Sequence, residues 1–280
     1  AIHRCIKADG TRVVGRVVEI SQAGRAPKND PAIFVLALAA KTGDAVTRET
    51  ALANMRYVCR TSTHMFQFAE ALERFGGWGR GTKRAFAEWY LSKQVDKVAY
   101  QAIKYRQRNG WTHRDILRLA KPKVLVHGSE NLYRWIVGKQ VEGELPALVA
   151  AFQKMEAAKT SGEVIEILGQ YPELPWETVP SEFLKDPSVW TALLPSMPMT
   201  ALIRNLARMT ANGTLTWTSA ATNLAVQKLT DAEQITRQRV HPISALIALK
   251  TYAAGSSVRG DSTWKPVTKI IDALDETFYT

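Results

Sequence analysis

The fold of this chain is decided by the stretch Gln94-Val-Asp-Lys-Val-Ala-Tyr-Gln-Ala-Ile-Lys-Tyr-Arg-Gln-Arg-Asn-Gly-Trp-Thr-His-Arg-Asp-Ile-Leu-Arg-Leu-Ala120. Its apolar side chains recur every three or four residues, first at Val95, Val98, Ala99, Ala102 and Ile103 and then at Ile116, Leu117 and Ala120. This period predicts two amphipathic helices, over 94–108 and 113–120, with Asn109-Gly110 as the break between them. Thr112, followed by the acidic Asp115 three residues later, is a helix N-cap signature. The stretch therefore predicts a helical hairpin.

The same helical period recurs along the rest of the chain. It predicts further helices over 31–42, 48–60, 64–75, 82–92, 130–141, 145–158, 162–170, 199–211, 219–229, 242–254 and 266–279, with a weaker one over 12–23. Strand signals are nearly absent, and the Pro-rich stretch 171–198 is the main irregular zone. Short breaks make neighbouring helices antiparallel, at about 35–45 residues per pair. The sequence thus predicts an all-α, HEAT-like helical-repeat solenoid, with more than about 60 % of its residues helical.

All of the excess positive charge of the chain lies in its first half. Residues 1–140 hold 25 Lys and Arg against 11 Asp and Glu, whereas residues 141–280 hold 12 against 15. The whole chain carries a net charge of +11. A field this one-sided attracts polyanions, which makes nucleic acid the leading candidate partner.

Composition excludes several classes of protein. The apolar content of 46 % is too high for a disordered chain. No apolar run approaches the roughly 18 residues of a membrane span, and residues 1–30 lack the regions of a signal peptide. The two cysteines, Cys5 and Cys59, match no disulfide framework, and Cys59 is expected to be a small buried hydrophobe. We therefore expect a cytoplasmic protein with no membrane partner.

Two consecutive predicted helices carry stripes of cations. Lys97, Lys104 and Arg108 share the polar side of the helix over 94–108, and Arg114, Arg118 and Lys121 share that of the next helix. A basic stripe on one helix is usually only a solvated face. Here, however, few carboxylates alternate with the cations at the i, i+4 spacing that such a face uses. We therefore interpret both stripes as phosphate contacts.

Three weaker signals accompany these stripes. Gly76-Gly-Trp-Gly-Arg-Gly-Thr-Lys-Arg84 is no P-loop, because Thr82 precedes Lys83 and the segment before it is helical. Its cations Arg80, Lys83 and Arg84 either hold a backbone phosphate at the start of a helix or belong to a flexible turn on which Trp78 packs. Trp111 either stacks on unpaired bases or belongs to the core. In the second half, Arg204 and Arg208 share one helix face.

No catalytic or metal-binding pattern is present in the sequence. The five histidines, His3, His64, His113, His127 and His241, show no ligand spacing with one another or with the cysteines. Patterns for zinc proteases, serine hydrolases and EF-hands are also absent. We therefore expect no enzyme activity, no catalytic residue, no metal and no cofactor.

Several longer strings carry a family resemblance. Lys104-Tyr-Arg-Gln-Arg-Asn-Gly-Trp-Thr-His-Arg-Asp-Ile-Leu-Arg-Leu119, Met197-Pro-Met-Thr-Ala-Leu-Ile-Arg-Asn-Leu-Ala-Arg-Met-Thr210 and Val240-His-Pro-Ile-Ser-Ala-Leu-Ile-Ala-Leu-Lys-Thr-Tyr252 resemble the TROVE module of Ro autoantigen proteins and their bacterial relatives. Trp78-Gly-Arg80, Ala87-Glu-Trp-Tyr90 and Arg259-Gly260 with Trp264-Lys-Pro266 match as well. The likeness runs in order over nearly the whole chain.

This resemblance implies a function. Ro proteins are HEAT-repeat rings that bind Y RNAs on the outer surface and hold single-stranded 3′ ends of misfolded or unprocessed RNAs in a basic central channel. Bacterial members are implicated in stress responses and in RNA quality control or processing alongside a 3′ exoribonuclease, which is expected here as a partner bridged by RNA. Lys104 and Arg108 fall on the family's Y-RNA contacts, and Lys121 stands near a family histidine.

The sequence departs from the family at its C-terminal end. Family members continue past the segment matching Asp275-Glu-Thr-Phe-Tyr279 into a von Willebrand factor A-type metal domain, and residues 1–280 end there. We therefore expect a single TROVE domain over 1–280, with a basic half 1–140 and a half 141–280 near neutral to acidic, forming a ring or an open horseshoe. The alternative from another class is an α-solenoid scaffold whose basic face binds an acidic protein.

Overall fold

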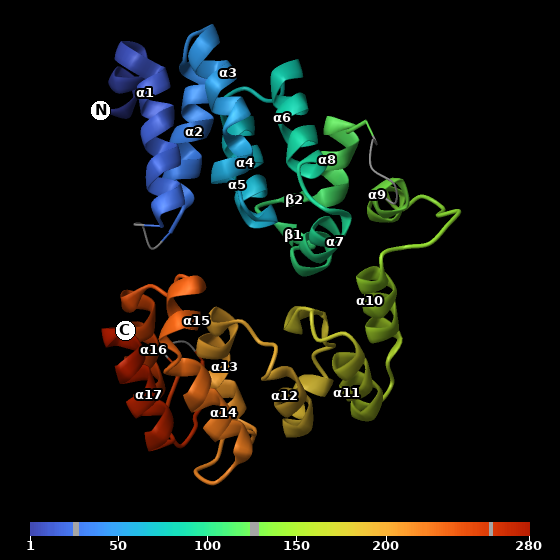
Figure 1. The fold of residues 1–280 in the computed structure, drawn as a ribbon, viewed down its shortest axis with the longest axis vertical. Coiled ribbons are helices and arrows are strands. Elements are labelled where there is room, and N and C mark those ends of the chain that lie inside the picture. The colour runs from blue at the N-terminus through green and yellow to red at the C-terminus, as the bar shows by residue number, and fades with distance from the viewer. Residues whose placement is uncertain (25–27, 124–128, 258–259) are drawn as a thin grey trace. The chain divides into compact units, whose positions relative to one another are not determined.

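The computed structural model describes residues 1–24, 28–123, 129–257 and 260–280 (Figure 1). Helices account for 69 % of the structure. The sheet in its described part is one antiparallel pair of two-residue strands. The predicted all-α class and the predicted helical content are therefore confirmed. His127 and Arg259 lie outside the described residues. The chain divides into two compact units, Ala1–Ala150 (unit 1) and Ala151–Thr280 (unit 2).

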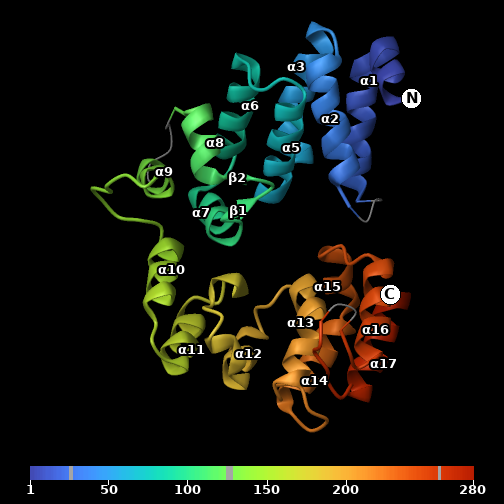
Figure 2. The same cartoon turned by 180° about the vertical axis from the view of Figure 1, so that it is seen from behind.

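Unit 1, which holds the basic part of the chain, is the part drawn from blue to green in Figures 1 and 2. Its elements are α1 (Ile2–Ala23), α2 (Asp30–Thr42), α3 (Ala45–Ala53), α4 (Met55–Val58), α5 (Ser62–Arg74), α6 (Arg80–Leu91), α7 (Val95–Lys104), β1 (Gln107–Arg108), β2 (Trp111–Thr112), α8 (His113–Ala120) and α9 (Ser129–Val137). The helices α3, α6, α8 and α9 are successive neighbours. They form a continuous series of helices across unit 1.

The core of unit 1 follows from the apolar period of its helices. In α5 the buried side chains are those that recur every three or four residues, including Met65, Phe66, Ala69 and Leu72. A hydrogen bond crosses this core: the indole Nε1 of Trp89 on α6 donates to the carbonyl oxygen of Cys59 at 2.5 Å. Cys59 is fully buried, as predicted, and burial raises the pKa of its thiol.

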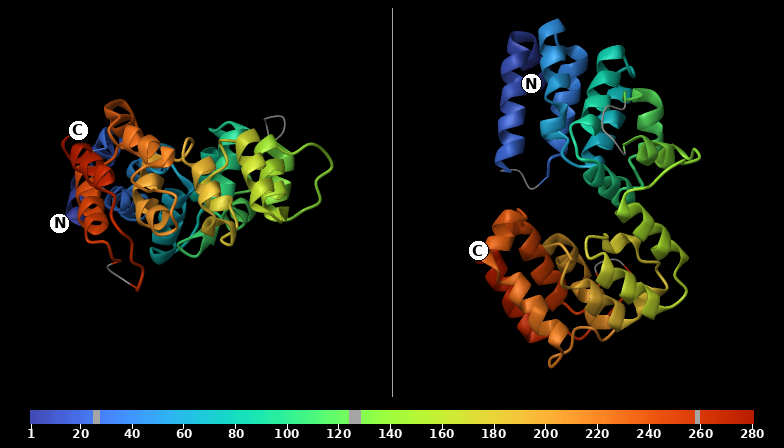
Figure 3. Two further views of the ribbon diagram at one scale, coloured as in Figure 1. Left: turned by 90° about the horizontal axis from the view of Figure 1, so that it is seen from below. Right: turned by 45° about the vertical axis from the view of Figure 1, so that its right-hand side comes forward.

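Unit 2 continues the helical pattern (Figure 3). Its elements are α11 (Ser161–Gln170), two short 3₁₀ helices (Trp176–Thr178 and Phe183–Lys185), α12 (Pro187–Leu193), α13 (Met199–Ala211), α14 (Ala220–Leu229), α15 (Ala232–Arg237), α16 (Pro242–Ala253) and α17 (Thr268–Tyr279); α10 (Ala147–Ala157) crosses the boundary between the units. Helices α16 and α17 pack along each other, and α14 packs on α17.

The positions of most helices agree with the sequence prediction, and the differences have local causes. The predicted helix 48–60 is two helices, α3 and α4, separated at Asn54. The irregular zone 171–198 contains α12, whose N-cap Asp186 accepts a hydrogen bond from the backbone N–H of Ser188. Short helices such as α12 and α15 give too few turns for an apolar period to be recognised.

The prediction of one helix over 94–108 is wrong at its C-terminal end. Helix α7 ends at Lys104, and a β-hairpin follows in which Arg108 pairs with Trp111. The turn residues Asn109 and Gly110 have φ values of 53° and 74°. Two successive left-handed residues are what a two-residue type I′ hairpin turn requires, and Asn-Gly is its preferred pair. The turn chemistry therefore overrides the helical period.

Candidate nucleic-acid interface

The hairpin separates the cations of the first predicted stripe. Lys97 is exposed on α7, and Lys104 is the last residue of that helix, with its Nζ 3.2 Å from the hydroxyl of Tyr100. Arg108 is exposed on β1, where its Nη1 donates to the carbonyl oxygen of Gln107. The expectation that Lys104 and Arg108 lie one turn apart on one helix face is therefore wrong. The two cations stand on two adjoining elements.

Trp111 is a packing residue as much as a surface one. Its ring is half-buried, with its centroid 5.4 Å from that of Trp78, which itself stacks on Phe86 at 4.2 Å. These contacts attach the hairpin to α6. Trp78 and Trp111 thus pack on unit 1 while their rings stay half-buried, and stacking of Trp111 on an unpaired base stays a prediction.

Helix α8 is fixed at its start by two devices. The side chain of Thr112 accepts from the N–H of Asp115 and the carboxylate of Asp115 accepts from the N–H of Thr112, which is the predicted capping box. His113, the first helical residue, is fully buried, with its Nδ1 2.8 Å from the hydroxyl of Tyr90 on α6. Burial lowers the pKa of His113 to about 3. The helix is thereby anchored through a neutral imidazole.

The second predicted stripe lines a groove. Arg114, Arg118 and Lys121 project from α8 and its C-cap into a space of about 440 Å³ beside α9. Three further charged groups line the same groove, namely Glu130, Arg134 and Lys139. Gly138 ends α9 with a φ of 75°, and a Cβ there would lie 3.6 Å from Nη2 of Arg114.

The groove is strongly basic. Arg134 is partly neutralised, because its guanidinium lies 3.8 Å from Glu130 and 3.3 Å from Glu142. No ion pair links Arg114, Arg118 or Lys121 to a carboxylate of the described residues. Five cations thus face one lining carboxylate, Glu130. Arginine and lysine at this density suit phosphate oxygens.

The glycine-rich segment supplies a second group of cations. Gly76 and Gly77 adopt φ values of 102° and 78°, and the chain then enters α6 at Gly79 without a side-chain cap. Arg80, Lys83 and Arg84 are exposed on the first turns of α6. The N-terminal N–H groups of this helix and three cations thus lie together.

The remaining predicted residues lie in unit 2. Arg204 and Arg208 are exposed on one face of α13, and the guanidinium of Arg208 lies 5.5 Å from the ring centroid of Trp190. Unit 2 therefore also has exposed cations.

Sequence reasoning missed Arg134 and Lys139 in the α8–α9 groove. Arg134 lies among carboxylates in sequence, and Lys139 lies beyond the end of its helix. Their approach to α8 was foreseeable only from the pairing of consecutive helices. No cluster of three or more His, Cys, Asp or Glu that could hold a metal occurs in the described part of the chain. Nor is any helix there long and apolar enough to cross a bilayer.

Comparison with known proteins adds three findings. Residues 5–254 match the model of the TROVE domain. The chain is 36 % identical to RNA-binding protein RO60 of Deinococcus radiodurans, covering 99 % of this chain and 53 % of that protein. It is 30 % identical to RNA-binding protein RO60 of Caenorhabditis elegans, covering 98 % of this chain and 54 % of that protein. The chain thus spans about half the length of these relatives.

A solved structure matches as well. The crystal structure of the Deinococcus radiodurans RO protein superposes with a TM-score of 0.83 at 35 % identity, over 99 % of this chain and 57 % of that one. At this identity the match extends to sequence as well as to fold.

Proposed function

Because this chain belongs to the TROVE domain family, we propose that it binds RNA through the basic face of unit 1. The observation that carries the proposal is the α8–α9 groove, where Arg114, Arg118, Lys121 and Lys139 face a single lining carboxylate. Lys104 and Arg108 flank the start of the same helix on α7 and the hairpin. Phosphate contacts of this kind give affinity and position the nucleic acid without reading its sequence.

The expected RNA is structured. Cations on successive elements, from Lys97 and the half-buried Lys104 through Arg108 to the α8–α9 groove, suit the backbone of a stem rather than a single phosphate. We therefore propose a Y-type small noncoding RNA as the ligand of this face. The cations at the start of α6, namely Arg80, Lys83 and Arg84, extend it.

The finer parts of the proposal follow from the family. Residues 1–280 act as one TROVE module without catalysis, in the cytoplasm. A second class of ligand is the single-stranded 3′ end of misfolded or unprocessed RNA, to which Arg204 and Arg208 of unit 2 contribute. The protein then serves RNA quality control under stress, with a 3′ exoribonuclease bridged by the RNA.

A salt titration tests the proposal. The affinity for a Y-like stem-loop should fall between about 50 and 200 mM salt with a log–log slope of magnitude about 0.7–0.9 for each phosphate contact. Arg118→Ala with Lys121→Ala should weaken binding and lower the slope by about two contacts. The control is Arg4→Ala with Lys7→Ala on α1, which removes the same charge from exposed positions that do not line the groove.

Two results would contradict RNA binding through phosphate contacts in the α8–α9 groove. One is a flat salt dependence for the wild type. The other is an equal loss of affinity in the groove and control variants, which would mean that only net charge matters. Co-purification with an acidic protein would favour the scaffold alternative, provided that no ribonuclease-sensitive material absorbing at 260 nm co-purifies.

A further inference from the structure

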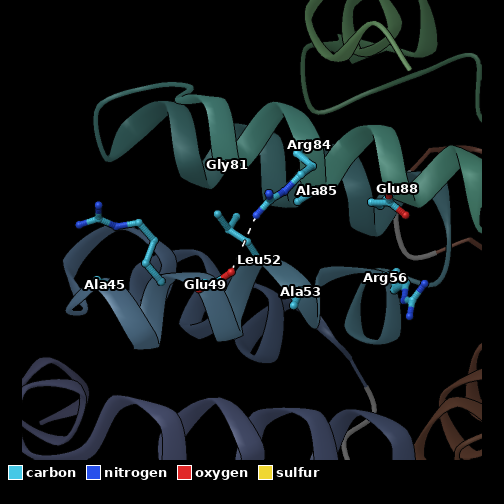
Figure 4. Close-up of a pocket in the computed structure, with 10 residues that line it drawn as sticks. Ala45, Glu49, Leu52, Ala53, Arg56, Gly81, Arg84, Ala85 and Glu88 are labelled. Carbon is cyan, nitrogen blue, oxygen red and sulfur yellow. Dashed lines mark ion pairs between the residues drawn. The ribbon is translucent and has the colours of Figure 1, made fainter. Parts of the chain in front are cut away.

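A second groove lies in unit 1, between α3–α4 on one side and α6 on the other (Figure 4). Its volume is about 580 Å³, within the range of pockets that bind small molecules. It is lined by Ala45, Arg48, Glu49, Leu52, Ala53, Arg56, Gly81, Arg84, Ala85 and Glu88. None of these residues lines the α8–α9 groove.

The floor of this α3–α6 groove is apolar and consists of small residues. Leu52 is the largest apolar residue there, and alanines and Gly81 make up the rest. A Cβ added at Gly81 would lie 3.1 Å from Cδ1 of Leu52, so the glycine lets α6 approach α3 closely. A floor of this kind accepts the face of a planar ring.

Three guanidinium groups surround the floor, each from a different helix. Arg48 comes from α3, Arg56 from α4 and Arg84 from α6. Arg84 reaches across the groove toward Glu49, with 4.0 Å between Nη2 and Oε1 (Figure 4). Both side chains are about three-quarters exposed, at 74 % and 78 %, so this ion pair is weak and a ligand can replace it.

Arg56 is held in place by its neighbour. Its guanidinium lies 4.8 Å from the ring centroid of Tyr57, and its Nη2 donates to the Tyr57 hydroxyl at 2.8 Å. A guanidinium offers both a fork for phosphate oxygens and a flat face for a base.

Two carboxylates decide which ligand fits. Glu49 and Glu88 line the groove together with the arginines. They would repel an acidic peptide along its whole length. They can, however, accept hydrogen bonds from the exocyclic amino group of adenine, cytosine or guanine, while the arginines bind the adjoining phosphates.

We infer that the α3–α6 groove binds an unpaired nucleotide of the RNA whose base bears an exocyclic amino group (adenosine, cytidine or guanosine), next to a stem held on the α8–α9 groove. The inference rests on the proposed function. It adds a separate subsite that reads a single-stranded base, and it assigns roles to Arg48, Arg56, Glu49 and Glu88, which sequence reasoning did not select.

The test compares three RNAs by fluorescence anisotropy at fixed salt. They are a blunt stem-loop, the same stem-loop with a 5′ tail of four adenosines, and the same stem-loop with a 5′ tail of four uridines. For the wild type, the adenosine tail should raise affinity at least fivefold over the blunt stem-loop and more than the uridine tail does.

Two variants of different kinds should remove this increment and leave blunt stem-loop binding unchanged. Arg48→Gln with Arg56→Gln removes the phosphate partners, and Ala53→Leu fills the exposed edge of the floor without changing charge. Ala23→Leu is the matched control, because Ala23 is also an exposed last residue of a helix. Unchanged melting temperatures check the fold, and Glu49→Gln with Glu88→Gln should reduce the preference for adenosine over uridine.

The outcomes separate the inference from the proposed function. If the wild type binds no stem-loop, the proposed function fails, and the inference fails with it. If it binds the blunt stem-loop but both groove variants keep the adenosine increment, only the inference is overturned. Binding of an acidic peptide that is lost in the groove variants, with no tail effect, would assign the groove to a protein partner and overturn it as well.

Discussion

Acidification should lower the free energy of unfolding of this protein, because a histidine is buried at the start of α8, the helix that carries the proposed RNA site. Burial lowers the pKa of His113 to about 3 in the folded state, and contact with the backbone of Gln101 opposes this only in part. An unfolded histidine has a pKa of about 6.5. Between these values the unfolded chain binds more protons than the folded one, so stability is lost as the pH falls from about 6.5 toward 3.

The magnitude follows from the two pKa values. A pH of 5 lies about 1.5 units below the pKa of the unfolded imidazole, which is therefore protonated, while the folded imidazole is still neutral. The free energy of unfolding is therefore about 2 kcal/mol lower at pH 5 than at pH 7.5. Burial also lowers the pKa of His64 on α5, to about 4, which acts in the same direction. A comparison with a His113 variant is therefore needed to isolate the contribution of this residue.

Urea denaturation of the wild type and His113→Gln, at pH 7.5 and pH 5, provides that comparison. Glutamine can still accept a hydrogen bond from Tyr90 but does not titrate. The variant should be less stable at pH 7.5, and it should lose about 2 kcal/mol less than the wild type on going to pH 5. Equal losses in both proteins would refute the assignment of this acid sensitivity to His113.

Two further predictions concern the hairpin. Lys104→Ala with Arg108→Ala should weaken Y-like RNA binding about tenfold at moderate salt and reduce the salt slope by about two contacts. Gel shifts between about 50 and 200 mM salt measure both effects. Unchanged affinity would mean that neither residue contacts the RNA. Gly110→Ala places a Cβ at a φ of 74° and should cost about 1 kcal/mol of stability in urea denaturation. Gly110→Asn, which tolerates this conformation better, should cost less, and equal costs would contradict a conformational origin.

The sequence predicted the helices because their apolar faces are periodic, and it failed where a local device competes with that period. Gln101 to Arg108 continues the polar stripe of α7, yet Asn109-Gly110 forms a hairpin turn that ends the helix at Lys104. Alternating apolar residues do not flank Asn109-Gly110, so the sequence gives no hairpin signal there. The strands are two residues each, too short for an alternation to be visible.

The candidate site was predicted in part for a related reason. Arg114, Arg118 and Lys121 follow one another at helical spacing, so their common face is visible in the sequence. Arg134 and Lys139 join them only because α9 packs beside α8, and Arg48 and Arg56 approach Arg84 only because α3 and α4 pack beside α6. These juxtapositions depend on tertiary packing, for which one sequence carries no direct signal.

The architecture of α8 separates what holds the helix from what faces solvent. His113, Ile116 and Leu117 are buried, whereas Arg114 and Arg118 on the same helix are exposed. Exposed substitutions typically change stability by no more than about 0.5 kcal/mol, while loss of a buried anchor costs several times that. Changes to the arginines should therefore alter RNA affinity without altering the denaturation midpoint. Changes to His113 should alter both the RNA affinity and the denaturation midpoint. If RNA affinity and stability fell together in the arginine variants, these side chains would have to be structural rather than ligand contacts.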